Sequence, residues 1–283
     1  MANRWIGIAT LGLMLSVNAA LIMRDIVPDW FAGDPPQSRA LDLRPGGVSN
    51  VQLSIFNQEG RRIGYSWTRS NRSGDLVTVR NQTMLQALQL PRGVTVPALR
   101  IDTELNYHGR SSLDQLQVTV YGLGPPVQLE GESIPPNDFP CQWQVGARRG
   151  SFVLSAEATR AIGDIIRPFD SLTGLAVGQS WRVKLLNPLA GIVPGWGGGN
   201  MDTDTMLVRV VALQRIKHNG GPIQVFMLEA ERFRAWVTPA GRVVRQEIDL
   251  PLFGVLTLVD EPYDEETHQQ VLHQPLRKAT EPD

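Results

Sequence analysis

The sequence predicts a mainly β protein: a strongly curved antiparallel sheet, or unclosed barrel, with one short helix, preceded by an N-terminal transmembrane or signal helix. Three observations predict this class. Apolar and polar residues alternate along many short segments, Gly, Asn and Pro stand between these segments, and one long uncharged stretch opens the chain. We take the segments in chain order.

Residues 1–24 predict a membrane anchor or signal segment. Trp5 to Met23 is uncharged and mostly apolar, and as a helix it would span about 28 Å, close to the ~30 Å hydrocarbon layer of a bilayer. The small residues Val17-Asn18-Ala19 fit a cleavage site, whereas the apolar residues that continue to Met23 favour a retained anchor. We expect an anchor in the cytoplasmic membrane through residues 5–23, with cleavage as the alternative. Arg4 favours an orientation that places the remainder on the periplasmic side of the cell envelope.

Residues 25–50 are rich in Pro and Gly and predict a linker between the membrane and the domain. Residues 51–260 carry the alternating pattern and predict one antiparallel β half-barrel domain. Residues 261–283 are polar, which predicts either a frayed tail or a weak short helix.

Alternation is clearest in the middle of the chain. From Leu99 to Tyr107 every second residue is apolar or Thr, and Ile63, Tyr65 and Trp67 alternate with Gly64, Ser66 and Thr68. One apolar face and one polar face are typical of an antiparallel sheet that is covered on one side. About ten to twelve strands are expected.

Turns and one helix complete the predicted fold. Asn219-Gly220 is typical of a tight hairpin turn, and Thr238-Pro239-Ala240-Gly241 is typical of a type I turn. Ser155 suits a helix N-cap, and apolar residues then recur at helical spacing, so we expect one short helix near Ala156–Ile166, ended by Pro168.

Charge and cysteine content narrow the possible partners. The chain has 27 basic and 28 acidic residues without a run of like charge, which argues against nucleic acid as a partner. The single cysteine, Cys141, cannot form an internal disulfide. It alternates with glutamines, so we expect a small buried core residue.

No residue pattern predicts catalysis, a cofactor or a metal. His108 and His218 fall in hairpin turns, while His268 and His273 fall in the tail, so we expect solvated histidines and no hydrolytic base. Asp202 and Asp204 lack the further acidic ligands that a calcium site requires. We therefore expect no enzyme, no cofactor and no metal.

Aromatic residues are the candidate ligand-binding residues. Tyr65, Trp67, Trp181 and Trp236 lie in predicted strands, mostly on the apolar face, and Trp196 ends an apolar loop before three glycines. These rings either fill an ordinary core or line a partly filled pocket for an acyl chain or similar ligand. The loop is either a flexible flap over the pocket or a segment packed on the end of the barrel.

Two stretches carry a resemblance to a known class of domain. Gly60-Arg61-Arg62-Ile63-Gly64-Tyr65 and Ala235-Trp236-Val237-Thr238-Pro239-Ala240-Gly241-Arg242-Val243-Val244-Arg245 resemble bacterial envelope half-barrels of the lipoprotein-carrier type and the uncharacterised β domains that precede some transglutaminase-like modules. The resemblance covers residues 51–260. It implies an unclosed barrel with an apolar inner face and a helical lid, often carrying lipid.

Two functions remain open from the sequence. The first is a non-catalytic envelope protein that binds an apolar small molecule such as a lipid or acyl chain. The alternative is a structural or assembly partner of a membrane protein complex. An envelope enzyme comes third.

Overall fold

The computed structural model describes residue 33 and residues 46–89, 95–109, 112–134, 139–154, 172–186, 203–250 and 254–272. Within these ranges, fourteen strands form a single sheet in which every pair of neighbours is antiparallel. In sheet order the strands are β10 (Arg148–Leu154), β9 (Phe139–Val145), β8 (Val127–Glu132), β7 (Ser112–Tyr121), β6 (Leu99–His108), β3 (Leu76–Leu85), β2 (Arg62–Ser73), β1 (Val48–Phe56), β16 (Gly254–Glu261), β15 (Val243–Leu250), β14 (Phe233–Val237), β13 (Gly221–Ala230), β12 (Thr203–His218) and β11 (Ser180–Leu186).

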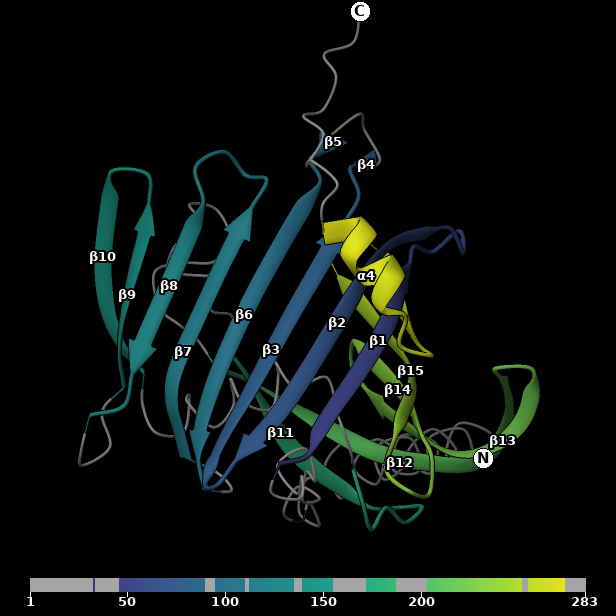
Figure 1. The fold of residues 1–283 in the computed structure, drawn as a ribbon. Helices are drawn as coiled ribbons and strands as arrows, with labels where there is room; N and C mark the ends of the chain where they lie inside the picture. Colours follow the sequence, from purple (N-terminus) through teal and green to yellow (C-terminus); the bar gives the residue numbers. More distant parts are fainter. Residues whose placement is uncertain are drawn as a thin grey trace, which may run out of the picture.

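The sheet is strongly bent and does not close. β10 and β11 stand at its two ends and do not pair with each other. In Figure 1 the strands from β11 to β13 cross behind β1, β2 and β3 at a steep angle, so the sheet folds back over itself. We call the side between the two halves the concave face and the opposite side the outer face. The predicted unclosed antiparallel sheet is confirmed, with more strands than expected.

The concave face is mostly apolar. Val79 pairs with Leu105 across β3 and β6, and both are almost completely buried. In the other half, Val210 pairs with Leu228 across β12 and β13 and is buried in the same way. Three apolar clusters lie along this face: one on β3 and β6–β10, one on β11–β15, and one where β1, β2 and β16 meet the small hairpin of β4 (Leu88–Gln89) and β5 (Thr95–Val96). Burial of these side chains is the main source of stability, at about 25 cal/mol per Å² of apolar area.

The predicted turns form as their residues dictate. Asn219 and Gly220 both have positive φ, 45° and 82°, which is the backbone that a two-residue hairpin of type I′ requires. In the hairpin of β14 and β15, the amide of Gly241 donates to the carbonyl oxygen of Thr238 over 2.8 Å. This bond joins the first and fourth residues of the predicted turn.

One helix, α4 (Glu265–Leu272), follows the last strand and lies on the outer face over β2 and β3 (Figure 1). Asp264 caps it, because its Oδ1 accepts from the amides of Glu266 (3.0 Å) and Thr267 (3.3 Å). Of the two structures that the sequence left open for residues 261–283, a helix forms at residues 265–272, while residues 273–283 lie outside the described residues. It docks on the sheet, whereas the helix expected near residues 156–166 lies outside the described residues.

The predicted membrane segment, residues 1–24, also lies outside the described residues. Within the described ranges, no helix is both long enough and apolar enough to span a bilayer. Cys141 is fully buried in the first apolar cluster, which confirms its prediction as a core residue.

Candidate functional site

A small polar cluster interrupts the apolar concave face at its centre. Asn81 Nδ2 donates to Ser66 Oγ and to Thr68 Oγ1, each over 2.9 Å. Ser66 Oγ lies 2.8 Å from Thr83 Oγ1, which in turn donates to Asn81 Oδ1 over 3.0 Å. Ser66, Asn81 and Thr83 thus form a closed hydrogen-bonded ring, to which Thr68 is joined through Asn81. We call the four side chains, Ser66, Thr68, Asn81 and Thr83, the hydroxyl–amide cluster.

The strand register places the hydroxyl–amide cluster among apolar neighbours. Thr68 pairs with Val51 on β1, and Asn81 pairs with Thr103 on β6. Thr103 pairs with Val118 on β7, where the face becomes apolar again. Burying neutral polar groups is tolerated because they bond to one another. Chemically, the cluster offers hydroxyl and amide groups to a polar atom of a ligand.

Trp181 is the one predicted ligand-binding residue that the described structure places on the concave face. It pairs with Val208 at the edge of the second half of the sheet and is only 2% exposed, within the apolar cluster of β11–β15. Trp196 and its loop lie outside the described residues.

Tyr65 and Trp67 lie on the outer face, contrary to the predicted placement. Ile55 pairs with Gly64 and Phe56 pairs with Arg62, so Ile63 is an extra residue in a β-bulge. The bulge lets Ile63 join an apolar cluster on the concave face while the alternation restarts after it. As a result Ser66 and Thr68 point inward and the two aromatic rings point outward.

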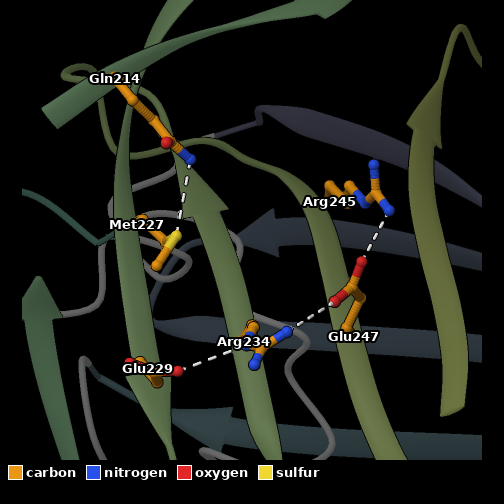
Figure 2. A network of polar contacts seen from close by, with 6 residues as sticks. All are labelled: Gln214, Met227, Glu229, Arg234, Arg245 and Glu247. Atoms are coloured by element: carbon orange, nitrogen blue, oxygen red, sulfur yellow. Dashed lines mark hydrogen bonds and ion pairs between the residues drawn. The ribbon is translucent and has the colours of Figure 1, made fainter. Parts of the chain in front are cut away.

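Trp236 also lies on the outer face, in the second half of the sheet. Arg245 covers its ring at 5.0 Å from the centroid. Figure 2 shows the surrounding ladder, in which Arg234 lies between Glu229 and Glu247, and Glu247 also binds Arg245. A hollow of about 490 Å³ beside Trp236 is lined by the end of β12 and by β15 and β16.

A cleft lies beside α4, between the helix and the strands of the outer face on which it docks. Trp67 lines it, and the Trp67 ring stacks on the ring of His268 with centroids 4.7 Å apart. His268 also bonds through Nε2 to Gln82 (2.8 Å) and through Nδ1 to Tyr263 (3.1 Å). Gln52 Oε1 accepts from both Trp67 Nε1 and the amide of Asp264, each over 3.0 Å. The cleft has a volume of about 400 Å³.

Burial shapes the acid–base chemistry of this cleft. It lowers the pKa of His268, an effect that the nearby Glu265 carboxylate opposes. Burial together with the hydrogen bond and charge of Glu265 raises the pKa of Tyr263 to about 12. The docked helix therefore favours neutral imidazole and neutral phenol side chains.

Two of the histidines expected to be solvated are packed instead. His268 contacts Trp67 as described, and His218 Nε2 lies 3.6 Å from the carboxylate of Asp260. Asp260 is 1% exposed and receives Arg242 Nη2 at 2.8 Å. The curvature of the sheet brings these groups together, which local sequence does not reveal.

The thiol of Cys141 and possible metal ligands were the other candidates in the sequence. Burial raises the pKa of the Cys141 thiol to about 12, which makes it unreactive. Among the described residues, no group of three His, Cys, Asp or Glu side chains is placed to hold a metal ion. Asp202 lies outside that part.

The fold and the site define a mainly β protein built on one bent, unclosed antiparallel sheet, with a polar cluster at the centre of an apolar concave face. Comparisons with protein-family models, with curated proteins and with solved structures give no match.

Proposed function

We propose that the chain is a non-catalytic cell-envelope protein that binds an apolar ligand with a polar end, such as a lipid or acyl chain, against the concave face. The hydroxyl–amide cluster is the observation that carries this proposal. Small-molecule sites are typically concave and mostly apolar, with a few placed polar groups that fix the ligand's orientation. The concave face has this composition.

The neutral character of the cluster indicates which polar group it suits. Ser66, Thr68, Asn81 and Thr83 carry no charge, so an ester, amide or hydroxyl fits better than an ionised headgroup, whose burial without a counter-charge is costly. The valine and leucine side chains on both sides of the cluster would contact the hydrocarbon part of the ligand.

Ligand entry requires movement of the chain. The side chains of the concave face are already buried in the chain itself. A ligand must displace what covers them, so we expect slow uptake and slow release.

Mass spectrometry of the extracted ligand tests this proposal. The full chain is purified in mild detergent and extracted with organic solvent, and a Thr83→Val variant is treated in parallel. We expect one lipid class in stoichiometric amount with the native chain and clearly less with the variant, because Val keeps the shape of Thr but breaks the ring of hydrogen bonds. Absence of any enriched lipid would refute the proposal.

A second function, as an assembly partner in a membrane complex, is favoured by the sheet edges. β11 stands at one end of the sheet, and its Ser180 carbonyl accepts from the amide of Gly33 over 2.9 Å in a parallel bridge. Edge strands pair readily with further strands. Crosslinking from a photoreactive residue at position 182, which is exposed, would identify a partner strand if this second function holds.

A further inference from the structure

We propose that the outer face of β2, β3 and β6–β9 binds a neutral oligosaccharide chain that lies across the strands. This site is separate from the concave face and does not depend on the function proposed for it. The shape of the face, the order of its side chains and their charge all favour such a ligand.

The outer face is hollowed along a line that crosses the strands. The cleft beside α4 and a second hollow of about 510 Å³ over β6–β9 share Glu104 and Gln117 in their linings. They therefore form one groove, which begins at α4 and ends near Ile134 and Pro140. Six strands about 4.8 Å apart give it a length of roughly 24 Å.

One row of paired residues forms the groove floor. In the strand register each member pairs directly with the next, from β2 to β9. The row consists of Arg69, Arg80, Glu104, Gln117, Glu130 and Gln142. Each side chain ends in a planar guanidinium, carboxylate or amide group.

Planar polar groups in a row suit the hydroxyl groups of sugars. A sugar hydroxyl both donates and accepts, and neighbouring hydroxyls on a ring can bind to two adjacent planar groups. Arg80 Nε donates to Glu104 Oε2 over 3.0 Å, and Gln117 Nε2 donates to Glu130 Oε1 over 3.3 Å. These bonds orient the side chains and leave further donors and acceptors directed at the groove.

Asp102 adds an acceptor that the described residues do not use. Its carboxylate pairs with Arg100 through Oδ2 at 3.2 Å. Its Oδ1 is buried and has no hydrogen-bond partner within the described part of the chain, although Asp102 lines the cleft. A buried acceptor without a partner is costly, and a sugar hydroxyl relieves this cost if the side chain turns Oδ1 toward the cleft.

The charge of the groove and the polar row on its floor favour a neutral sugar chain over other polymeric ligands. Acidic side chains outnumber basic ones in the groove, which disfavours nucleic acid, phosphate-bearing chains and acidic sugars. A peptide would need either a sheet edge or a series of apolar pockets for its side chains. The row from Arg69 to Gln142 is polar throughout, and each of its strands is paired on both sides. A neutral oligosaccharide carries no negative charge and needs neither a sheet edge nor apolar pockets.

Titration calorimetry tests the proposal on the full chain in a polyoxyethylene detergent, which avoids sugar headgroups. The probes are the hexamers of cellulose, amylose and chitin, with a hexamer of galacturonic acid as the charged control. The variants are Gln117→Ala, at the exposed centre of the groove, and Glu229→Gln, on the outer face of the other half of the sheet.

We expect at least one neutral hexamer to bind with a Kd of millimolar or tighter, and the acidic hexamer to bind more weakly. Gln117→Ala should raise that Kd at least tenfold at an unchanged melting temperature, whereas Glu229→Gln should leave it unchanged. The proposal fails if none of the neutral hexamers binds, if the acidic hexamer binds best, or if both variants weaken binding equally.

Discussion

The indole of Trp67 and the imidazole of His268 stack with ring centroids 4.7 Å apart and planes inclined by 29°. Trp67 belongs to the sheet and His268 to the helix that follows its last strand, 201 positions later. The pair therefore joins an early strand of the sheet, β2, to the helix that follows the last strand. Because His268 titrates, docking of α4 should depend on pH.

The docking of α4 should weaken as the pH falls below about 6.5. Burial lowers the pKa of His268 in the docked state, while the undocked side chain keeps the ordinary value near 6.5. The undocked state therefore takes up the proton first, and docking loses free energy as the pH falls from 6.5 toward the lowered pKa. Glu265 acts electrostatically on this ring and Tyr263 bonds to it, while Arg69 on β2 lines the same cleft and acts on Tyr263 and Glu265. Backbone amide chemical shifts of residues 265–272 should report the transition.

His268→Gln provides the control for this titration. Glutamine does not titrate, so the step just below pH 6.5 should disappear. A second weakening at lower pH should persist, because hydrogen bonds from Thr267 lower the pKa of the Asp264 carboxyl group and the helix cap is lost when it is protonated. An unchanged step just below pH 6.5 in the variant would assign the transition to another group.

The sequence predicted the class of fold because its strands follow simple alternation. Leu99 to Tyr107 and the Asn219-Gly220 turn behave as short-range physical chemistry requires. The bulge at Ile63 could not be predicted in this way. Its extra residue reverses which face of the sheet the following side chains occupy, but the alternating Ile63, Tyr65 and Trp67 give no sign of it. Ser66 and Thr68 consequently resembled solvent-facing residues, although they lie inside.

The docking of α4 and the position of Asp260 could not be predicted for a different reason. Both depend on contacts between residues far apart in the chain. His268 meets Gln82 at a separation of 186 residues, and the composition of the tail is that of a solvated segment. Only the bend and register of the sheet bring such groups together.

Replacing Arg242 should destabilise the fold more than replacing Arg234. The two side chains are similarly exposed, 60% and 55%, but Arg242 pairs with Asp260, which is 1% exposed. Arg234 instead pairs with Glu229 and Glu247, which are 44% and 19% exposed (Figure 2). Arg242→Gln should cost about 2–4 kcal/mol, because it weakens the compensation of a buried charge. Arg234→Gln should cost less than about 1 kcal/mol. Urea unfolding measures both, and equal losses would contradict this explanation.

Gly64→Ala should be severely destabilising because of the close approach at the bulge. A Cβ at this position would lie 2.1 Å from the carbonyl oxygen of Met84, so the backbones of β2 and β3 would have to separate. We expect a loss of more than about 3 kcal/mol. Gly221→Ala is the matched control, since a Cβ there meets nothing within 4 Å, and its change in unfolding free energy should stay within about 1 kcal/mol.

The thiol of Cys141 should be inert in the folded protein. Its pKa is about 12 and its side chain is fully buried, so at pH 8 very little thiolate is present and access is blocked. A disulfide exchange reagent should label the native chain at least ~100-fold more slowly than the chain in denaturant. Comparable rates would show that the first apolar cluster opens readily.

If an apolar ligand lies against the concave face, nuclear Overhauser contacts to a bound fatty ester will locate it there. With methyl-labelled Leu and Val, we expect contacts from the hydrocarbon chain to Val79, Leu105 and Leu228. We expect none to the exposed methyl groups of Leu76 and Val153, which are 42% and 64% exposed. Contacts only to those exposed methyl groups, or no binding at all, would contradict binding at the concave face.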